Sequence, residues 1–367
     1  MKAEVGIKLE QVRELLKQQR VKGAMLGLQP NFSWLTAGGE GHVPISSVLA
    51  NGRLIVTRSR FYLLANAIEM PRFLKEVVHG LEVVPLEYSW DKPEKAEALV
   101  KRIANPRHIV SDTGEWGTQS KPALFGPLRQ SFQPAEVRRY RKLGRDAEEA
   151  VRHTAMGIEP GMSEFEIAGV LSGEALKRDL TPVVMLVAVD NRIGQFRHPI
   201  PSRKKLKKLA MVVLSARRAG QIVAMTRLVH FGSMSAPLRR KHEAVCFVDS
   251  VFHHFTRPGQ AVRDIFGAGV SVYKAQGFAD EWKRHHQGGA SGYVGREFLG
   301  SSSSPEVVRD NQPFAWNPTI TGTKSEDTIL ATAATTDVVT DSSGSDWPMI
   351  EIEVDGQLHR RPDILER

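Results

Sequence analysis

The chain has 367 residues, of which 41% are hydrophobic and 25% are charged, a composition typical of a soluble globular protein with two domains. No apolar run is long enough to span a bilayer, and the N-terminus lacks the apolar core of a signal peptide. We therefore expect a cytoplasmic protein without a membrane partner. The single cysteine, Cys246, excludes an intrachain disulfide and a cysteine-rich zinc site, and its apolar neighbours predict a buried thiol.

The formal net charge of +9 is concentrated in two basic runs, at residues 138–145 and 203–208. Such runs occur in proteins that bind nucleic acids. No aromatic residues are interleaved with these basic residues, and neither run matches a known DNA-reading motif. We therefore predict solvated surfaces rather than a nucleic-acid site, with an acidic ligand or partner as the alternative.

The first part of the chain alternates between helical and strand-like patterns. A helix is expected at residues 8–22, and strands are expected at residues 23–28, 47–50 and 54–57. Asn51-Gly52, between the last two, is a strong signal for a hairpin turn. Further short strands are expected around residues 83–85 and 108–110. The pattern predicts a small α/β domain that ends near residue 130.

The remaining sequence begins with a basic stretch, residues 134–146, which we interpret as the connection between domains, followed by a helix to about residue 156. Ser163 and Glu166 form a capping-box pattern for the next helix. Pro160-Gly161 with Ile167 and Gly169 recurs further along the chain as Pro258-Gly259 with Ile265 and Gly267. The recurrence predicts a duplicated α/β unit with a cleft between its halves.

Several short segments share a further pattern. In the first domain, Asn31-Phe32-Ser33-Trp34-Leu35-Thr36-Ala37-Gly38 is similar to N-x-x-Y-L-T-G. In the second domain the segments are Ile158-Glu159-Pro160-Gly161-Met162-Ser163-Glu164, His198-Pro199, Met211-Val212-Val213-Leu214, Thr226-Arg227, Asn317-Pro318 and Ser325-Glu326-Asp327-Thr328. Their order and spacing resemble those of the creatinase, aminopeptidase P and prolidase family. The resemblance covers nearly the whole chain. It implies an α/β (α+β) protein with a creatinase-type domain at residues 1–133, a pseudo-two-fold pita-bread domain at residues 134–367, and a homodimer.

The resemblance also identifies the positions of the family's metal ligands, which are two aspartates, one histidine and two glutamates that hold two divalent ions. Here these positions are occupied by Ser215, Ala224, Gly289, Asn317 and Glu326. Only Glu326 is a ligand of the expected type, and no aspartate lies between Asp190 and Asp249 to replace the others. One carboxylate cannot offset the repulsion between two divalent cations. We therefore predict no metal and no other cofactor.

Titratable residues remain that could meet in the cleft. By the resemblance, His198 corresponds to the family histidine that contacts the reacting group, and in creatinase, which uses no metal, to the proton shuttle. We predict His198 and Glu326 as catalytic residues, because a His–Glu pair can carry out acid–base chemistry without a metal. The predicted substrate-binding residues are Arg296, Lys324, His285, Arg217 and Asn317. Arg217, Arg218 and Arg296 would attract an anionic ligand.

Each prediction has an alternative. Glu326 could be a structural partner of Lys324 or Arg227, and His198 with His285 and Glu326 could hold a single metal ion. His242, His253 and His254 fall on a predicted amphipathic helix, where we expect them to face solvent.

The leading function is a metal-independent, creatinase-like hydrolase or lyase that acts on a C–N bond of a small amino-acid derivative. The first alternative is a non-catalytic pseudopeptidase that binds a ligand or protein, as in the peptidase-like domain of a histone chaperone of this family. The second alternative is an Xaa-Pro aminopeptidase or prolidase, which would require a bound metal pair. The expected partners are a small anionic or amino-acid-like ligand and a second copy of the chain.

Overall fold

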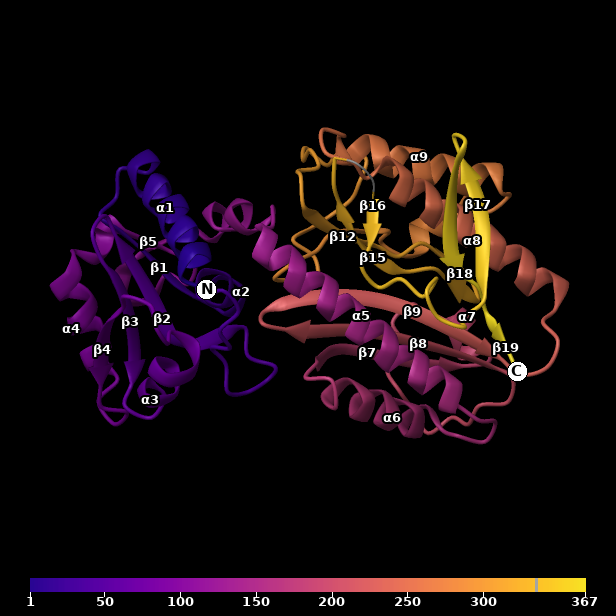
Figure 1. Cartoon of the computed structure of the whole chain (residues 1–367), viewed down its shortest axis with the longest axis horizontal. Helices are drawn as coiled ribbons and strands as arrows, with labels where there is room; N and C mark the ends of the chain where they lie inside the picture. Colours follow the sequence, from indigo (N-terminus) through magenta and orange to yellow (C-terminus); the bar gives the residue numbers. More distant parts are fainter. Residues whose placement is uncertain (334–335) are drawn as a thin grey trace. The chain divides into compact units, whose positions relative to one another are not determined.

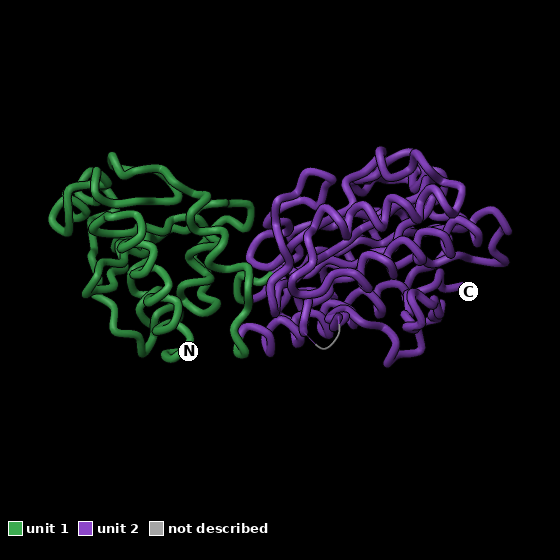
Figure 2. The backbone as a smooth tube through the Cα atoms, turned by 90° about the horizontal axis from the view of Figure 1, so that it is seen from above, with its two compact units in different colours: residues 1–135, 219–221 green, residues 136–218, 222–367 purple. Residues whose placement is uncertain are grey.

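The computed structural model describes residues 1–333 and 336–367, and these form two units. Figure 2 shows a first unit of residues 1–135 with 219–221 and a second unit of residues 136–218 with 222–367. Within the described residues, no helix has the length and apolar character needed to cross a membrane. Both units combine helices with sheets, which confirms the predicted α/β fold class.

The first unit is built around a six-stranded mixed sheet with the order β4-β3-β2-β1-β5-β6. Its strands are β1 Gly23–Leu28, β2 Leu49–Thr57, β3 Phe61–Asn66, β4 Val84–Tyr88, β5 Ile109–Ser111 and β6 Gln119–Ser120. Its α-helices are α1 Lys2–Gln18, α2 Gln29–Leu35, α3 Met70–Arg72 and α4 Glu94–Ile103. Figure 1 shows these elements in indigo and violet. The apolar core beneath α4 includes Met25, Ile55 and Leu64.

The hairpin turn predicted at Asn51-Gly52 is wrong, because β2 runs without interruption through both residues. Gly52 pairs with Ala65 in the sheet, and a Cβ at Gly52 would lie only 2.7 Å from the ring of Phe73. The glycine therefore permits close packing in a strand and does not form a turn. The reversal between β2 and β3 comes later, where Thr57 N–H bonds to Arg60 O at 2.9 Å.

The second unit contains two larger sheets with helices against them (Figure 1). One sheet has the order β19-β9-β8-β7, and the other has the order β11-β10-β12-β15-β16. The strands of the first are β7 Thr181–Val189, β8 Leu209–Arg218, β9 Gln221–His230 and β19 Leu365–Glu366. Those of the second are β10 Gly288–Ala290, β11 Phe298–Leu299, β12 Gln312–Trp316, β15 Asp327–Ala331 and β16 Thr336–Val338.

Two hairpins and several helices complete the second unit. The hairpins pair β13 Thr319–Ile320 with β14 Thr323–Lys324, and β17 Met349–Val354 with β18 Gln357–Pro362. The helices are α5 Pro134–Gly157, α6 Glu164–Leu176, α7 Arg192–Gln195, α8 Ala236–Phe255 and α9 Val262–Ala275. An apolar core joins α8 and α9 to the second sheet, and Phe252 stacks on Trp316 with ring centroids 4.5 Å apart.

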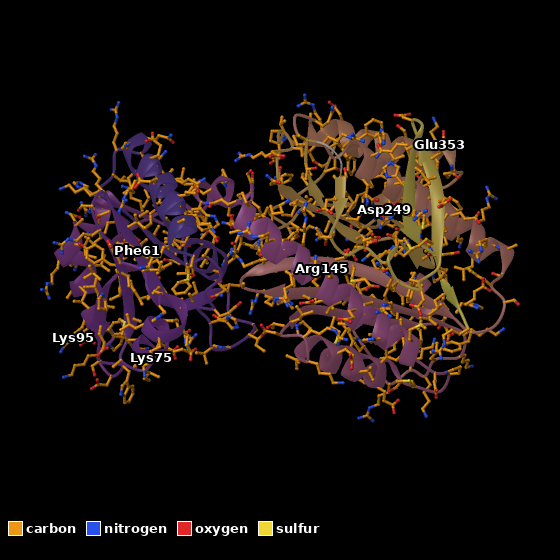
Figure 3. All side chains as sticks on the ribbon, in the orientation of Figure 1. Phe61, Lys75, Lys95, Arg145, Asp249 and Glu353 are labelled. Atoms are coloured by element: carbon orange, nitrogen blue, oxygen red, sulfur yellow. The ribbon has the colours of Figure 1, made fainter. Side chains whose placement is uncertain are left out.

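The basic stretch predicted to connect the domains is instead the first half of α5, which runs unbroken from Pro134 to Gly157. Leu143 and Ala147 are buried on one side of this helix. Arg145, labelled in Figure 3, is exposed on the other side. The charge run is therefore the solvated face of an amphipathic helix.

The predicted duplication has a counterpart in the backbone. Gly161 and Gly259 both adopt positive φ, +95° and +91°, just before α6 and α9. Each donates its N–H to a carbonyl of a later strand-like segment, Leu206 O and Val308 O, both at 2.9 Å. The capping box predicted at Ser163 and Glu166 is confirmed at the start of α6. The same glycine turn thus precedes both helices, although the N-cap residue of α9, Ala261, makes no side-chain cap.

Candidate functional site

Glu326 lies where the strands of the second sheet end. Trp316, the last residue of β12, pairs with Asp327, the first residue of β15. Asn317, which follows Trp316, and Glu326, which precedes Asp327, therefore lie next to each other at the end of this strand pair. Both residues are buried. Ser325 N–H donates to Pro318 O at 3.2 Å, which holds the two connecting segments together. The sheet thus positions the two predicted site residues at one end.

Both carboxylate oxygens of Glu326 are engaged. Lys324 Nζ lies 2.6 Å from Oε2, Thr226 Oγ1 donates to the same oxygen at 2.7 Å, and Arg296 Nη2 donates to Oε1 at 3.3 Å. Burial by itself would raise the pKa of this carboxyl, but Lys324, Arg296 and Thr226 lower it to about 2. Glu326 is therefore ionised at neutral pH, pairs with two cations and is poorly suited to exchange protons there.

His198 and His285 meet beside this ion cluster. Their Nε2 atoms lie 3.1 Å apart, and their rings meet edge to face. Arg197 fixes the segment that carries His198, because its Nη2 bonds to Glu281 at 3.0 Å and to Thr321 at 2.7 Å. Partial desolvation, with Lys324 nearby, lowers the pKa of His198, and burial of His285 beside the same lysine lowers its pKa to about 3. The pair is therefore neutral at neutral pH.

His286 joins the pair, although the sequence pattern predicts it only as part of a polar turn with Arg284 and not as a site residue. Its ring stacks on His285 with centroids 4.4 Å apart and lies 5.8 Å from that of His198. His286 is exposed by surface area, but partial desolvation of its ring, followed by Arg296, lowers its pKa to about 4. Thr226, which binds Glu326, was also not predicted as a site residue. The available signals were the double histidine at 285–286 and the Thr226-Arg227 motif.

The two arginines at the end of β8 point to opposite faces of the sheet, since they are adjacent in a strand. Arg218 Nη1 donates to Asp146 of α5 at 2.5 Å. Its charge is therefore balanced on the helix-covered face, and the expectation that it adds positive charge to the site is wrong. Arg217 is buried, its backbone pairs with Thr181 of β7, and its side chain lies on the face that carries Ser215.

At three other positions that the resemblance assigns to metal ligands, the backbone is held by hydrogen bonds or by close packing. Ala224 N–H donates to Thr328 Oγ1 at 2.7 Å in the buried part of β9. A Cβ at Gly289 would lie 2.3 Å from Phe298 O, so this backbone path accepts only glycine. Asn317 N–H donates to Gln287 O at 3.0 Å, while its side-chain Oδ1 is buried and without a hydrogen-bond partner in the described part of the chain.

His242 and His253 are buried on α8, and the expectation that they face solvent is wrong. His242 bonds to Thr323 Oγ1 at 2.7 Å and to Pro362 O at 3.1 Å. Burial lowers the pKa of His242 to about 4 and that of His253 well below its ordinary value. His254 is only partly buried. Cys246 is buried as predicted, and burial raises the pKa of its thiol.

A charge network lies directly behind the site. Arg361 pairs with Asp249 at 3.1 Å and with Asp327, and Arg227 Nη2 bonds to Asp327 at 3.0 Å. All four side chains are fully buried, and Asp249 is labelled on α8 in Figure 3. Ser325 Oγ donates to Asp249 at 2.6 Å. The network therefore fixes the residues on both sides of Glu326.

A small α/β unit and a duplicated α/β unit with a polar cluster between its sheets define the class of pita-bread, peptidase-like proteins. The sequence pattern of metallopeptidase family M24 matches residues 138–333, more than half of the chain. The chain belongs to this family. No curated protein is similar to it in sequence.

Solved structures support the same fold. An Xaa-Pro dipeptidase from Bacillus anthracis superposes with a TM-score of 0.78 at 18% identity, over 99% of this chain and 100% of that chain. Dipeptidase PepE from Mycobacterium ulcerans gives 0.77 at 14%, over 93% and 96%. The N-terminal domain of FACT complex subunit SPT16 from Cicer arietinum gives 0.72 at 11%, over 93% and 97%. At these identities the likeness concerns the fold alone.

Proposed function

We propose that this member of the family lacks the two-metal centre and uses Arg296, Lys324 and His198 to bind a small anionic ligand, such as the carboxylate of an amino-acid derivative. The observation that carries the proposal is the Lys324 ammonium, 2.6 Å from the one carboxylate that the resemblance retains among the metal ligands. A lysine cation in this position takes the place of a metal ion and repels one.

The donor set does not fit two divalent ions. The resemblance places Ser215, Ala224, Gly289 and Asn317 at the other ligand positions, and none of these side chains is anionic. Hard divalent ions held a few ångströms apart require several carboxylates. Because a Cβ at Gly289 would collide with Phe298 O, a histidine ligand there would require a different backbone. We therefore derive no reaction step through a metal pair.

The charges favour an anion. Lys324 and Arg296 carry two positive charges against one negative charge on Glu326, and the neighbouring histidines are neutral at neutral pH. Arg296 Nε is buried and has no hydrogen-bond partner among the described residues. A guanidinium with unused N–H groups is suited to hold a carboxylate through two hydrogen bonds. The unpaired Asn317 Oδ1 could accept a hydrogen bond from an amide or amine of the same ligand.

A second candidate is the metal-independent hydrolase or lyase expected from the sequence. The arrangement of His198 favours it. One of the two Nε2 atoms, 3.1 Å apart, must carry a proton. If His198 donates to His285, its own Nδ1 keeps a lone pair and could act as a general base. The dipeptidase names of several structural neighbours suggest dipeptides as first substrates to test.

Ligand binding separates these candidates from a metallopeptidase. We expect small carboxylates and Xaa-Pro dipeptides to raise the melting temperature of the purified protein, and Arg296→Gln to abolish the increase. Arg263→Gln is the matched control, because Arg263 is exposed and pairs only loosely with Asp264 at 3.8 Å. Stabilisation without turnover supports the binding protein. Turnover that is lost in His198→Ala supports the hydrolase. Two metal ions per chain, with activity that a chelator abolishes, would overturn the proposal.

A further inference from the structure

We propose that His198, His285 and His286 bind one transition-metal ion, such as Zn²⁺, Ni²⁺ or Cu²⁺, at a mononuclear site distinct from the positions of the family's metal pair. One ligand nitrogen from each of the three imidazoles lies within 4.8 Å of the others. Among the positions that the resemblance assigns to metal ligands, none is His198, His285 or His286. The metal site shares His198 with the proposed anion site, but it does not require that an anion binds there.

The spacing of the nitrogens suits one ion. A tetrahedral zinc ion with Zn–N bonds of about 2.0–2.1 Å holds its ligand atoms about 3.3 Å apart. The Nε2 atoms of His198 and His285 are already 3.1 Å apart. The ring of His286 stacks on that of His285, with centroids 4.4 Å apart, so its ligand nitrogen lies within reach of the same ion once the rings turn toward it. Imidazole nitrogens select zinc, copper and nickel over magnesium and calcium.

The surroundings of His285 prepare it as a ligand. Its Nδ1 lies 3.4 Å from Thr319 Oγ1, and that hydroxyl donates its own proton to Asn317 O at 3.2 Å. The hydroxyl oxygen therefore accepts from Nδ1–H, which leaves the Nε2 lone pair free for a metal. An outer hydrogen bond of this kind fixes the tautomer and orientation of metal-ligating histidines.

The other two ligands adjust at small cost. His198 is exposed and needs only to move its proton from Nε2 to Nδ1. His286 Nδ1 accepts a long hydrogen bond of 3.3 Å from Gly288 N–H, and metal binding through Nε2 would break it. Because all three histidines are neutral at neutral pH, no proton has to be displaced from a charged imidazolium before the metal binds.

Nearby charges set the expected strength of binding. Lys324 and Arg296 oppose a cation at this place, and Glu326 favours it. The three imidazoles leave at least one coordination position open, which water or an anion can fill. If the anion site proposed above exists, a small carboxylate bound to Arg296 should tighten metal binding. This last step rests on the proposed function, whereas the metal site itself does not.

Metal titration of the full-length protein tests the site. After treatment with a chelator, calorimetry with ZnCl₂ and elemental analysis should give one zinc per chain. His198→Ala and His286→Ala should each weaken binding at least tenfold, and both positions are exposed, so the variants should fold. His79→Ala, at an exposed histidine of the first unit, is the matched control and should bind zinc normally. Cobalt bound at the site should show the intense visible absorption of a tetrahedral complex.

Several outcomes would overturn the proposal. Zinc binding no tighter in the unmodified protein than in His198→Ala would do so, as would two metal ions per chain that persist in both histidine variants. The second result would also contradict the proposed function. In contrast, the protein could bind one zinc ion per chain with an affinity that acetate does not change, while both histidine variants bind zinc more weakly. This result would support the metal site and contradict only the anion site.

Discussion

Lys324 and Glu326 form a buried ion pair at the one position where the resemblance retains a carboxylate among the metal ligands. The pair is buried, with 4% and 3% of the respective side chains exposed. Two buried charges are stable only when each is paired and hydrogen-bonded, and Glu326 meets this condition through Lys324, Arg296 and Thr226. The resemblance identifies His198 and Glu326 as candidate catalytic residues. A structural ion pair between Glu326 and Lys324 is among the alternatives that the sequence suggests. The contribution of Thr226 depends on a contact between β9 and the end of the other sheet, which the sequence around Thr226 does not predict.

We predict that Lys324→Met destabilises the protein by up to about 3–5 kcal/mol, because it leaves the Glu326 charge buried with one cation fewer. The pKa of Glu326 should rise in this variant. Urea unfolding at pH 7 measures the change. Lys283→Met is the matched control, since Lys283 and its partner Asp280 are exposed, and it should cost less than about 1 kcal/mol. Adding Glu326→Gln to Lys324→Met should restore much of the lost stability. Equal stability of Lys324→Met and the unmodified protein would contradict this account.

At the level of elements, sequence patterns located most helices and strands, and their errors have one cause. Asn51-Gly52 carries a strong local turn signal, yet β2 continues through both residues, and Gly52 packs against Phe73. The basic residues of α5 read as a connection, yet its buried face makes one continuous helix. His242 and His253 read as a polar face, yet the β17–β18 hairpin covers that side of α8. In each case tertiary contacts, which a local pattern does not contain, override the local signal.

Two glycines of α9 offer a direct test of this effect of packing. A Cβ at Gly269 would lie 2.2 Å from the Phe252 ring, whereas a Cβ at Gly267 would meet nothing within 4 Å. We expect Gly269→Ala to destabilise the protein by about 1–3 kcal/mol through overpacking. Gly267→Ala should stabilise it by about 0.5–1 kcal/mol, because alanine favours the helix. Thermal and urea unfolding of both variants measure the difference. The same sign of change in the two variants would show that packing against Phe252 does not decide the outcome.

Across the whole molecule, the histidines with lowered pKa values are expected to make the folded state less stable in acid. Burial lowers the pKa of His242 to about 4, partial burial lowers that of His359 to about 4, and burial lowers the pKa of His253 well below its ordinary value. The folded state therefore holds these rings neutral at a pH where the unfolded chain would protonate them. Asp249 acts in the opposite direction, since burial raises its pKa to about 6. The histidines outnumber it, and Glu326, with its lowered pKa, adds to their effect at lower pH.

We predict that the free energy of unfolding falls as the pH is lowered from 6.5 towards 4. Between the unfolded and folded pKa values, each buried histidine binds a proton only in the unfolded chain, so stability drops by about 1.4 kcal/mol per pH unit for each such group. Urea unfolding at pH 7.5, 6.0 and 4.5 measures the slope. His242→Gln should be less stable at pH 7.5, because it loses part of the bonding to Thr323 and Pro362, but its slope should be shallower. His79→Gln, at an exposed position, should leave the slope unchanged. A flat profile, or the same slope in His242→Gln, would show that protonation of buried histidines does not govern acid unfolding.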